Sequence, residues 1–298
     1  MKKIIGIIIG ILLLTGIGQV INHQNQPNQN TTPKTEQTVK ETRKNFDTSY
    51  GTNKRNTMTV RLPEKVTAET PMVLFMHGGA WTSGDKKDVA IVQEVFAKSN
   101  IASASINYRY ASSTIHYADL MKDVGSAVTY IQTHKSDWGL SGSKIAIGGI
   151  SAGAHMALLY TYAYDSKNDI DAVISLAGPT DLTNTEMLDT AVKNNMINFV
   201  QWLVNDTYKK GTPVGKNFSA VSPIKHLKNI PTLLVQGNGD SIVLYSQSTM
   251  LDTALADAGI PHKLITIPGA NHDLGLGNPK YAAQIATEVT AWIKKYNK

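Results

Sequence analysis

The chain has 298 residues, of which 42% are hydrophobic and 17% are charged, enough apolar content for one large catalytic domain with additional segments. Its formal net charge is +6, but Lys2, Lys3 and the segment 34–61 carry much of the positive charge. Because no basic run is interleaved with aromatic residues, we expect no nucleic-acid partner. The chain has no cysteine, which excludes disulfides, a thiolate nucleophile and Cys-ligated zinc.

The first 22 residues have the pattern of a targeting segment. Two lysines follow Met1, and residues 4–20 are then almost entirely apolar or small. This pattern favours a signal peptide, and the alternative is an uncleaved N-terminal membrane anchor at the short end of the usual length. Both readings predict an extracellular protein, either secreted or anchored on the outer face of the cytoplasmic membrane.

Residues 23–45 are rich in Asn, Gln, Thr, Lys and Glu and almost lack large apolar side chains. Such a segment cannot bury enough surface to offset the entropy of ordering, so we expect a flexible polar tether. The catalytic domain is then expected at residues 46–298.

Strand and helix patterns alternate along this domain, which predicts an α/β fold with a mainly parallel central sheet flanked by helices. The alternation is interrupted at about residues 181–221, where we expect a small inserted lid. The expected strands are 57–62, 72–76, 101–108, 144–148, 171–177, 232–236 and 262–267, and the expected helices are 89–97, 117–134, 152–164, 246–258 and 279–296.

The motif Gly149-Ile150-Ser151-Ala152-Gly153 follows one expected strand and precedes an expected helix. In this context G-x-S-x-G predicts a nucleophile elbow, a strained turn that raises the serine hydroxyl above the sheet. The flanking glycines, Gly149 and Gly153, are small enough to let strand and helix approach closely. Ser151 is therefore the candidate nucleophile.

A second motif, with the sequence HGGAW, occupies residues 77–81 directly after the strand expected at 72–76. Acyl transfer passes through a tetrahedral oxyanion, which backbone N–H groups can stabilise. Glycines let the main chain approach that oxygen closely. Gly78 and Gly79 are therefore the expected donors, together with the amide of Ala152.

The ends of this motif have other expected roles. His77 precedes the oxyanion loop, so we expect it to support the loop through hydrogen bonds rather than to act as a base. Trp81 is expected to line the substrate pocket, although a packing role is nearly as well supported.

The HGG loop and the elbow, together with Asn107-Tyr108-Arg109-Tyr110, resemble the hormone-sensitive-lipase-like and acetyl-xylan/feruloyl-esterase-like branch of the α/β-hydrolase family. The segments 178–182 (GPTDL) and 222–224 (SPI) strengthen this resemblance, which covers roughly residues 57–298. It implies an α/β-hydrolase fold and a carboxylesterase or lipase-like activity. Many relatives have a third glycine at the position of Ala80, and the pattern H-G-G-x-W also resembles kynurenine formamidases.

In this fold the catalytic residues follow in the order Ser, acid, His. His272 lies just after the last expected strand, where α/β sheets place functional groups and where the resemblance also puts the base. Asp240 follows the preceding strand and matches the family's acid; Asp273 and Asp181 are weaker candidates. The remaining histidines fit less well by order or by element: His116, His134, His155, His226 and His262.

The leading hypothesis is an exported serine hydrolase that cleaves small acyl esters, carried on a polysaccharide or on a small-molecule alcohol, through an acyl-enzyme. Cleavage of an amide, by a formamidase-like or peptidase-like enzyme, is a second hypothesis. A third is a surface binding protein on a non-catalytic hydrolase scaffold, although the complete triad argues against it. No cofactor is expected. No metal is expected either, since no His and carboxylate cluster has ligand spacing. The oligomeric state remains open.

Overall fold

The computed structural model describes residues 44–297. The expected targeting segment at 1–22, and all but the last two residues of the expected tether at 23–45, lie outside the described residues. In the described part of the chain, no helix is both long and apolar enough to cross a membrane.

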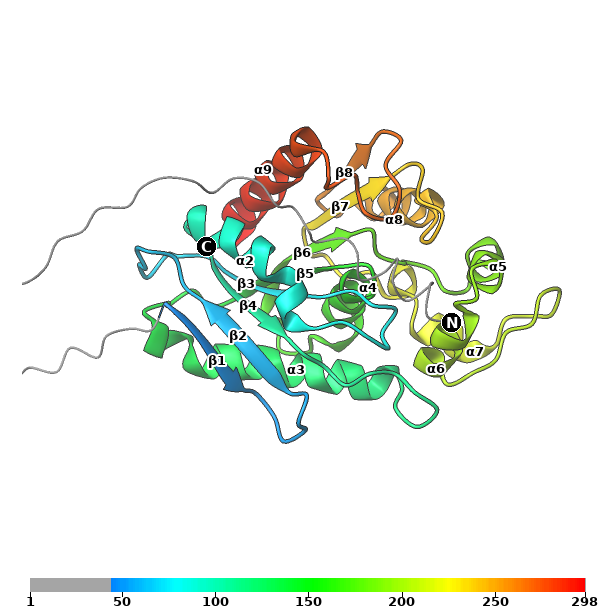
Figure 1. The fold of residues 1–298 in the computed structure, drawn as a ribbon, viewed down its shortest axis with the longest axis horizontal. Helices are drawn as coiled ribbons and strands as arrows, with labels where there is room; N and C mark the ends of the chain where they lie inside the picture. Colours follow the sequence, from blue (N-terminus) through cyan, green and yellow to red (C-terminus); the bar gives the residue numbers. More distant parts are fainter. Residues whose placement is uncertain (1–43, 298) are drawn as a thin grey trace, which may run out of the picture.

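An eight-stranded sheet forms the centre of the domain, with strand order β1-β2-β4-β3-β5-β6-β7-β8 (Figure 1). The six strands from β4 to β8 in this order run parallel, whereas β1 and β2 are antiparallel to their neighbours. The α/β fold with a mainly parallel sheet is thus confirmed. The strands are β1 (Asn45–Ser49), β2 (Thr57–Arg61), β3 (Met72–Met76), β4 (Ala102–Ile106), β5 (Ile145–Ile150), β6 (Ile170–Leu176), β7 (Thr232–Gly237) and β8 (His262–Ile267).

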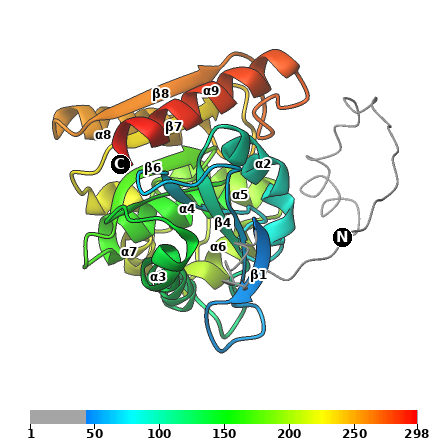
Figure 2. The same ribbon diagram turned by 90° about the vertical axis from the view of Figure 1, so that its left-hand side faces the viewer.

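Helices cover both faces of the sheet, and α3 and α9 lie on opposite sides of it (Figures 1 and 2). Every residue of β3 is buried, because alternate side chains enter the core on each face: Leu74 on one, Phe75 on the other. The face of Phe75 is covered by α2 (Ala90–Lys98) and α9 (Pro279–Tyr296), and the face of Leu74 by α3 (Tyr117–His134), α4 (Ala152–Leu159) and α8 (Tyr245–Asp257).

Several element boundaries predicted from sequence are confirmed to the residue, namely 117–134, 262–267 and 279–296. Strand β1 is not predicted from the sequence, and its first residue, Asn45, is the last residue of the expected tether. β1 is polar and exposed at alternate positions, so its sequence carries no strand signal; pairing with β2 and the contact of Phe46 with Trp138 hold it. The helix expected at 152–164 is α-helical only to Leu159 and continues as a π-helical turn, η3 (Tyr160–Tyr164).

The interruption expected at 181–221 lies between β6 and β7 and contains three short helices. Figure 1 shows these helices grouped at one end of the sheet. Leu203 and Phe218 from this insertion are buried in the main core, so it packs onto the domain as a cap. The helices are α5 (Thr185–Lys193), α6 (Ile197–Val204) and α7 (Lys216–Ala220).

Candidate active site

Ser151 stands at the sharp turn between β5 and α4. Its backbone angles, φ 54° and ψ −120°, lie in a region that L-residues seldom adopt. A Cβ atom at Gly149 would lie 2.5 Å from the carbonyl carbon of Gly153, and one at Gly153 would lie 2.4 Å from the carbonyl oxygen of Met76. The turn therefore requires glycine at both positions, as the motif predicted.

The loop that follows β3 runs beside this turn. A Cβ atom at Gly78 would lie 3.3 Å from the Cβ of Ser151, and Gly79 has a φ of 107° that favours glycine. Among the described residues, no hydrogen bond uses the backbone N–H of Gly78, Gly79 or Ala152. These three amides are therefore available to a developing negative charge next to the serine.

His77 has the contacts that a supporting role requires. Its ring is fully buried and stacks on Tyr108 with centroids 4.4 Å apart. Nδ1 lies 2.7 Å from the carbonyl oxygen of Gly78, which can only accept, so Nδ1 carries the proton. Burial lowers the pKa of His77 to about 4, so the ring is neutral at pH 7. A neutral imidazole that bridges the loop to Tyr108 fixes the position of Gly78.

Trp81 has the contacts of the packing role that was the alternative for it, and its role in substrate binding stays a prediction. The residue is only 4% exposed, and its indole Nε1–H donates to Nδ1 of His155 at 3.2 Å. The Nε2 of His155 lies 2.7 Å from the carbonyl oxygen of Val221 and donates to it. The indole can be buried because its one polar group, the Nε1–H, has a hydrogen-bond partner in His155. Trp81 thus joins the oxyanion loop to α4 and the end of the cap.

The structure brings Ser151, His272 and Asp240 together, although 121 residues separate the first two in sequence. The Nε2 of His272 lies 2.9 Å from the Oγ of Ser151, and its Nδ1 lies 2.8 Å from the Oδ2 of Asp240. These distances suit a base that accepts the serine proton and an acid that holds the imidazole tautomer.

The carboxylate of Asp240 is completely buried, and its oxygens accept hydrogen bonds from four sides. Oδ1 accepts from the backbone N–H groups of Ile242 and Val243 at 2.9 and 3.0 Å. Oδ2 accepts from Nε2 of Gln236 at 2.7 Å as well as from His272. These four donors fix the carboxylate in position beside the imidazole of His272.

Two residues that sequence reasoning missed position this pair. Gln236 is fully buried in β7, and its Oε1 accepts from Ser248, which fixes its amide with Nε2 toward Asp240. Asn271 accepts through Oδ1 from the N–H of His272 and the N–H of Ser241, joining the two loops. The sequence signal for Gln236 is a polar glutamine near the end of a buried strand, four residues before Asp240.

The weaker acid candidates are engaged elsewhere. The carboxylate of Asp181 accepts from Thr183 and pairs with Lys225 at 3.9 Å, and that of Asp273 accepts from the N–H of Gly275. Within residues 44–297, no three His, Asp or Glu side chains gather as they would around a metal ion.

Arg109, from the motif at 107–110, holds the segment after β4 against α3. Its guanidinium binds Asp123 and Asp119 at 2.9 Å each, and this pairing raises the pKa of Arg109. Asn107 receives a hydrogen bond from the N–H of Lys86 and donates one to Asp85. These contacts tie the segment after β4 to α3 and to the end of the oxyanion loop.

Curated relatives are similar over most of this domain. A probable isoprenylcysteine alpha-carbonyl methylesterase of Arabidopsis thaliana is 25% identical over 77% of this chain and 51% of its own length. The esterase LipQ of Mycobacterium tuberculosis is 28% identical over 75% of this chain and 55% of its own length. The chain therefore spans about half the length of the curated relatives it matches.

Solved structures share the fold. A truncated carbohydrate esterase from gut microbiota superposes with a TM-score of 0.68 at 18% identity, covering 86% of this chain and 98% of its own. An esterase of Thermogutta terrifontis superposes with a TM-score of 0.65 at 20% identity, covering 84% and 91%. The sequence model of the family described as BD-FAE matches residues 58–255, and the chain belongs to that family.

Proposed function

We propose that the protein is a serine hydrolase that cleaves carboxylic esters of small acyl groups. One observation carries the proposal: an unbroken chain of contacts runs from Ser151 Oγ through the His272 ring to buried Asp240, at 2.9 and 2.8 Å. The unused amides beside Ser151 and the esterase names of the relatives support it. The complete triad weighs against a binding protein on an inactive scaffold.

The reaction would follow from this geometry. As Ser151 Oγ attacks the ester carbonyl, Nε2 of His272 accepts its proton, and Asp240 stabilises the imidazolium. The amides of Gly78, Gly79 and Ala152 would donate to the oxyanion. His272 then gives its proton to the departing alcohol, which leaves an acyl group on Ser151. Water, deprotonated by His272, releases the acid and restores the serine.

The substrate class is part of the proposal. An ester carried on a polysaccharide agrees with a carbohydrate esterase among the structural neighbours, and a small alcohol as the leaving group agrees with the methylesterases among the relatives. The lysines followed by an apolar run at the N-terminus support export to the cell exterior.

The test is hydrolysis of p-nitrophenyl esters of increasing acyl length, beside a formyl-anilide and a Ser151→Ala variant. We expect turnover of the short esters, and its loss in the variant. Turnover of the anilide without the esters would instead support the amide hydrolase that the H-G-G-x-W pattern leaves open. Turnover that survives in Ser151→Ala would refute the assigned nucleophile.

A further inference from the structure

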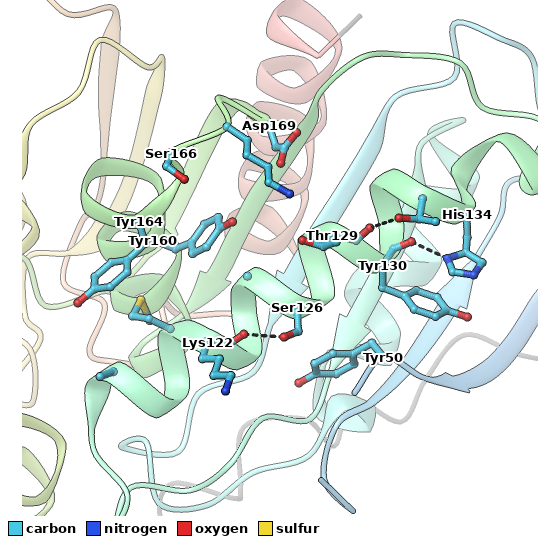
Figure 3. A pocket seen from close by; sticks show the side chains of 15 residues that line it. Tyr50, Lys122, Ser126, Thr129, Tyr130, His134, Tyr160, Tyr164, Ser166 and Asp169 are labelled. Carbon is cyan, nitrogen blue, oxygen red and sulfur yellow. Dashed lines mark hydrogen bonds between the residues drawn. The ribbon is translucent and has the colours of Figure 1, made fainter. Parts of the chain in front are cut away.

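A groove of about 720 Å³ runs along the outer surface of α3, formed in part by Tyr50 and by the turn η3 with the loop after it (Figure 3). Its lining residues include no member of the triad and no oxyanion donor. The groove follows α3 from Ala118 to His134, a helical rise of about 24 Å. Its size is in the range of ligand-binding clefts in proteins.

The hydroxyl of Tyr160 borders this groove and has no hydrogen-bond partner among the described residues. Five described tyrosines are at least nine-tenths buried, and Tyr160 is 7% exposed. No described residue hydrogen-bonds to the Tyr160 hydroxyl, which Figure 3 shows directed toward α3. The hydroxyls of the other four have partners: Tyr50 with Asn107, Tyr108 with His77, Tyr162 with Thr232 and Tyr208 with Asp189. A hydroxyl that faces the groove and makes no hydrogen bond within the described residues can donate to or accept from a ligand there.

The floor of the groove is open because α3 has a glycine there. Gly125 lies in the interior of an 18-residue helix, where glycine is less favourable than alanine. Packing does not require it: a Cβ atom would be 3.4 Å from the ring of Tyr160, which is ordinary contact, and φ is not in the left-handed region. The missing side chain leaves the Tyr160 ring and hydroxyl accessible from outside.

The rim carries both donors and acceptors. Lys122 and Lys167 are exposed and form no ion pair with another described residue. Asp169 supplies a carboxylate, and Tyr164, which is 38% exposed, adds an aromatic surface. Hydroxyl groups complete the lining at Ser126, Thr129, Thr133 and Ser166.

From these features we propose that the groove binds a segment of a carbohydrate chain, without catalysing any reaction on it. Sugar hydroxyls both donate and accept, which matches a lining of ammonium, carboxylate and hydroxyl groups, and sugar rings have apolar faces that pack on tyrosines. The carboxylate of Asp169 disfavours a phosphate group, and the polar rim disfavours an apolar helix. The groove would hold a polymer while another part of it enters the catalytic site. It extends the proposed action on polysaccharide-borne esters, but binding does not require Ser151.

The test is electrophoresis of the full chain in native gels that contain soluble xylan, galactomannan or polygalacturonate. We expect at least one polysaccharide to retard the protein, and to retard Ser151→Ala equally. Gly125→Gln, which fills the floor with a good helix former, and Tyr160→Phe, which removes only the hydroxyl, should each reduce the retardation at least threefold. Both variants should hydrolyse p-nitrophenyl acetate at the unaltered rate. Because small esters do not need the groove, failure of the groove proposal and failure of the esterase proposal are distinguishable.

A stability comparison provides a second measurement. Tyr160→Phe should leave the midpoint of thermal unfolding unchanged or raise it, because no protein hydrogen bond is lost. The matched control Tyr162→Phe should lower the midpoint, because that buried hydroxyl is 2.6 Å from Thr232. Absence of retardation in every gel, equal retardation of the two groove variants and the wild type, or a midpoint lowered as much by Tyr160→Phe as by the control would overturn the proposal.

Discussion

Gln236 donates from Nε2 to the Oδ2 of Asp240 at 2.7 Å, the same carboxylate oxygen that lies 2.8 Å from the Nδ1 of His272. The glutamine is fully buried, and its amide is oriented by Ser248 on the other side. The position of the proposed acid therefore depends on a side chain that hydrogen-bonds to neither His272 nor Ser151.

Replacing Gln236 by leucine removes this donor and leaves an apolar side chain of similar size in β7. We expect kcat/KM for a short ester to fall about tenfold, equivalent to about 1.4 kcal/mol, because the carboxylate loses one of its hydrogen bonds. A value of kcat/KM equal to that of the wild type in a folded variant would show that Gln236 does not position the acid.

Gln236→Glu gives a sharper measurement, the pH profile of kcat/KM. At low pH the new carboxyl is protonated and can donate to Asp240 as the glutamine does. At higher pH it ionises beside the carboxylate of Asp240, so the donor is lost and the two negative charges repel each other. The variant should therefore lose activity on the alkaline side, where the wild type keeps it. A profile parallel to that of the wild type would contradict this expectation.

The backbone strain at Ser151 predicts that replacing this residue by glycine removes activity but increases stability. Ser151→Gly and Ser151→Ala should both lose about 10⁴–10⁶-fold in kcat. Only glycine tolerates a φ of 54° and a ψ of −120° without strain, so Ser151→Gly should unfold with a free energy about 1 kcal/mol higher than Ser151→Ala. Chemical denaturation of the two variants provides the measurement, and equal stabilities would mean that the turn is unstrained.

Close packing at the elbow predicts that Gly153 tolerates no side chain. A Cβ there would lie 2.4 Å from the Met76 carbonyl oxygen, so Gly153→Ala should lower the free energy of unfolding by about 1–3 kcal/mol and displace Ser151. Gly277→Ala is the matched control, because a Cβ at Gly277 meets no atom within 4 Å. Similar melting temperatures for the two variants would rule out this packing.

Two buried histidines predict how stability depends on pH. Burial lowers the pKa values of His77 and His155 to about 4, below the value of about 6.5 expected in the unfolded chain. The unfolded state therefore binds their protons first as the pH falls. The contribution of the two neutral histidines to the free energy of unfolding is fully present above about pH 6.5. It is lost progressively toward pH 4, by up to about 3 kcal/mol for each group.

His155→Gln isolates one of these contributions, since the glutamine amide can still donate to the carbonyl of Val221. The variant should unfold with a shallower dependence on pH between about 6.5 and 4 than the wild type does. Urea denaturation at a series of pH values measures the slope, and an unchanged slope would show that His155 does not titrate with unfolding.

The sequence by itself determined the fold class, the approximate extent of most elements and the three residues that the structure brings together. These follow from local signals: apolar runs of strand length, helical periodicity, and a G-x-S-x-G motif whose order relative to Asp240 and His272 is characteristic of one fold. It also determined that residues 149 and 153 must be small, because the G-x-S-x-G motif brings the strand and the helix close together at these two glycines.

Only the tertiary structure decided the contacts between segments that are distant in sequence. The burial of Trp81 has no local sign in the sequence; its partner, His155, is 74 residues away. Strand β1 depends on β2, and the unpaired hydroxyl of Tyr160 is seen only when every neighbouring element is in place. Local patterns specify elements and motifs, but burial and hydrogen-bond partners depend on which distant segments the folded chain brings together.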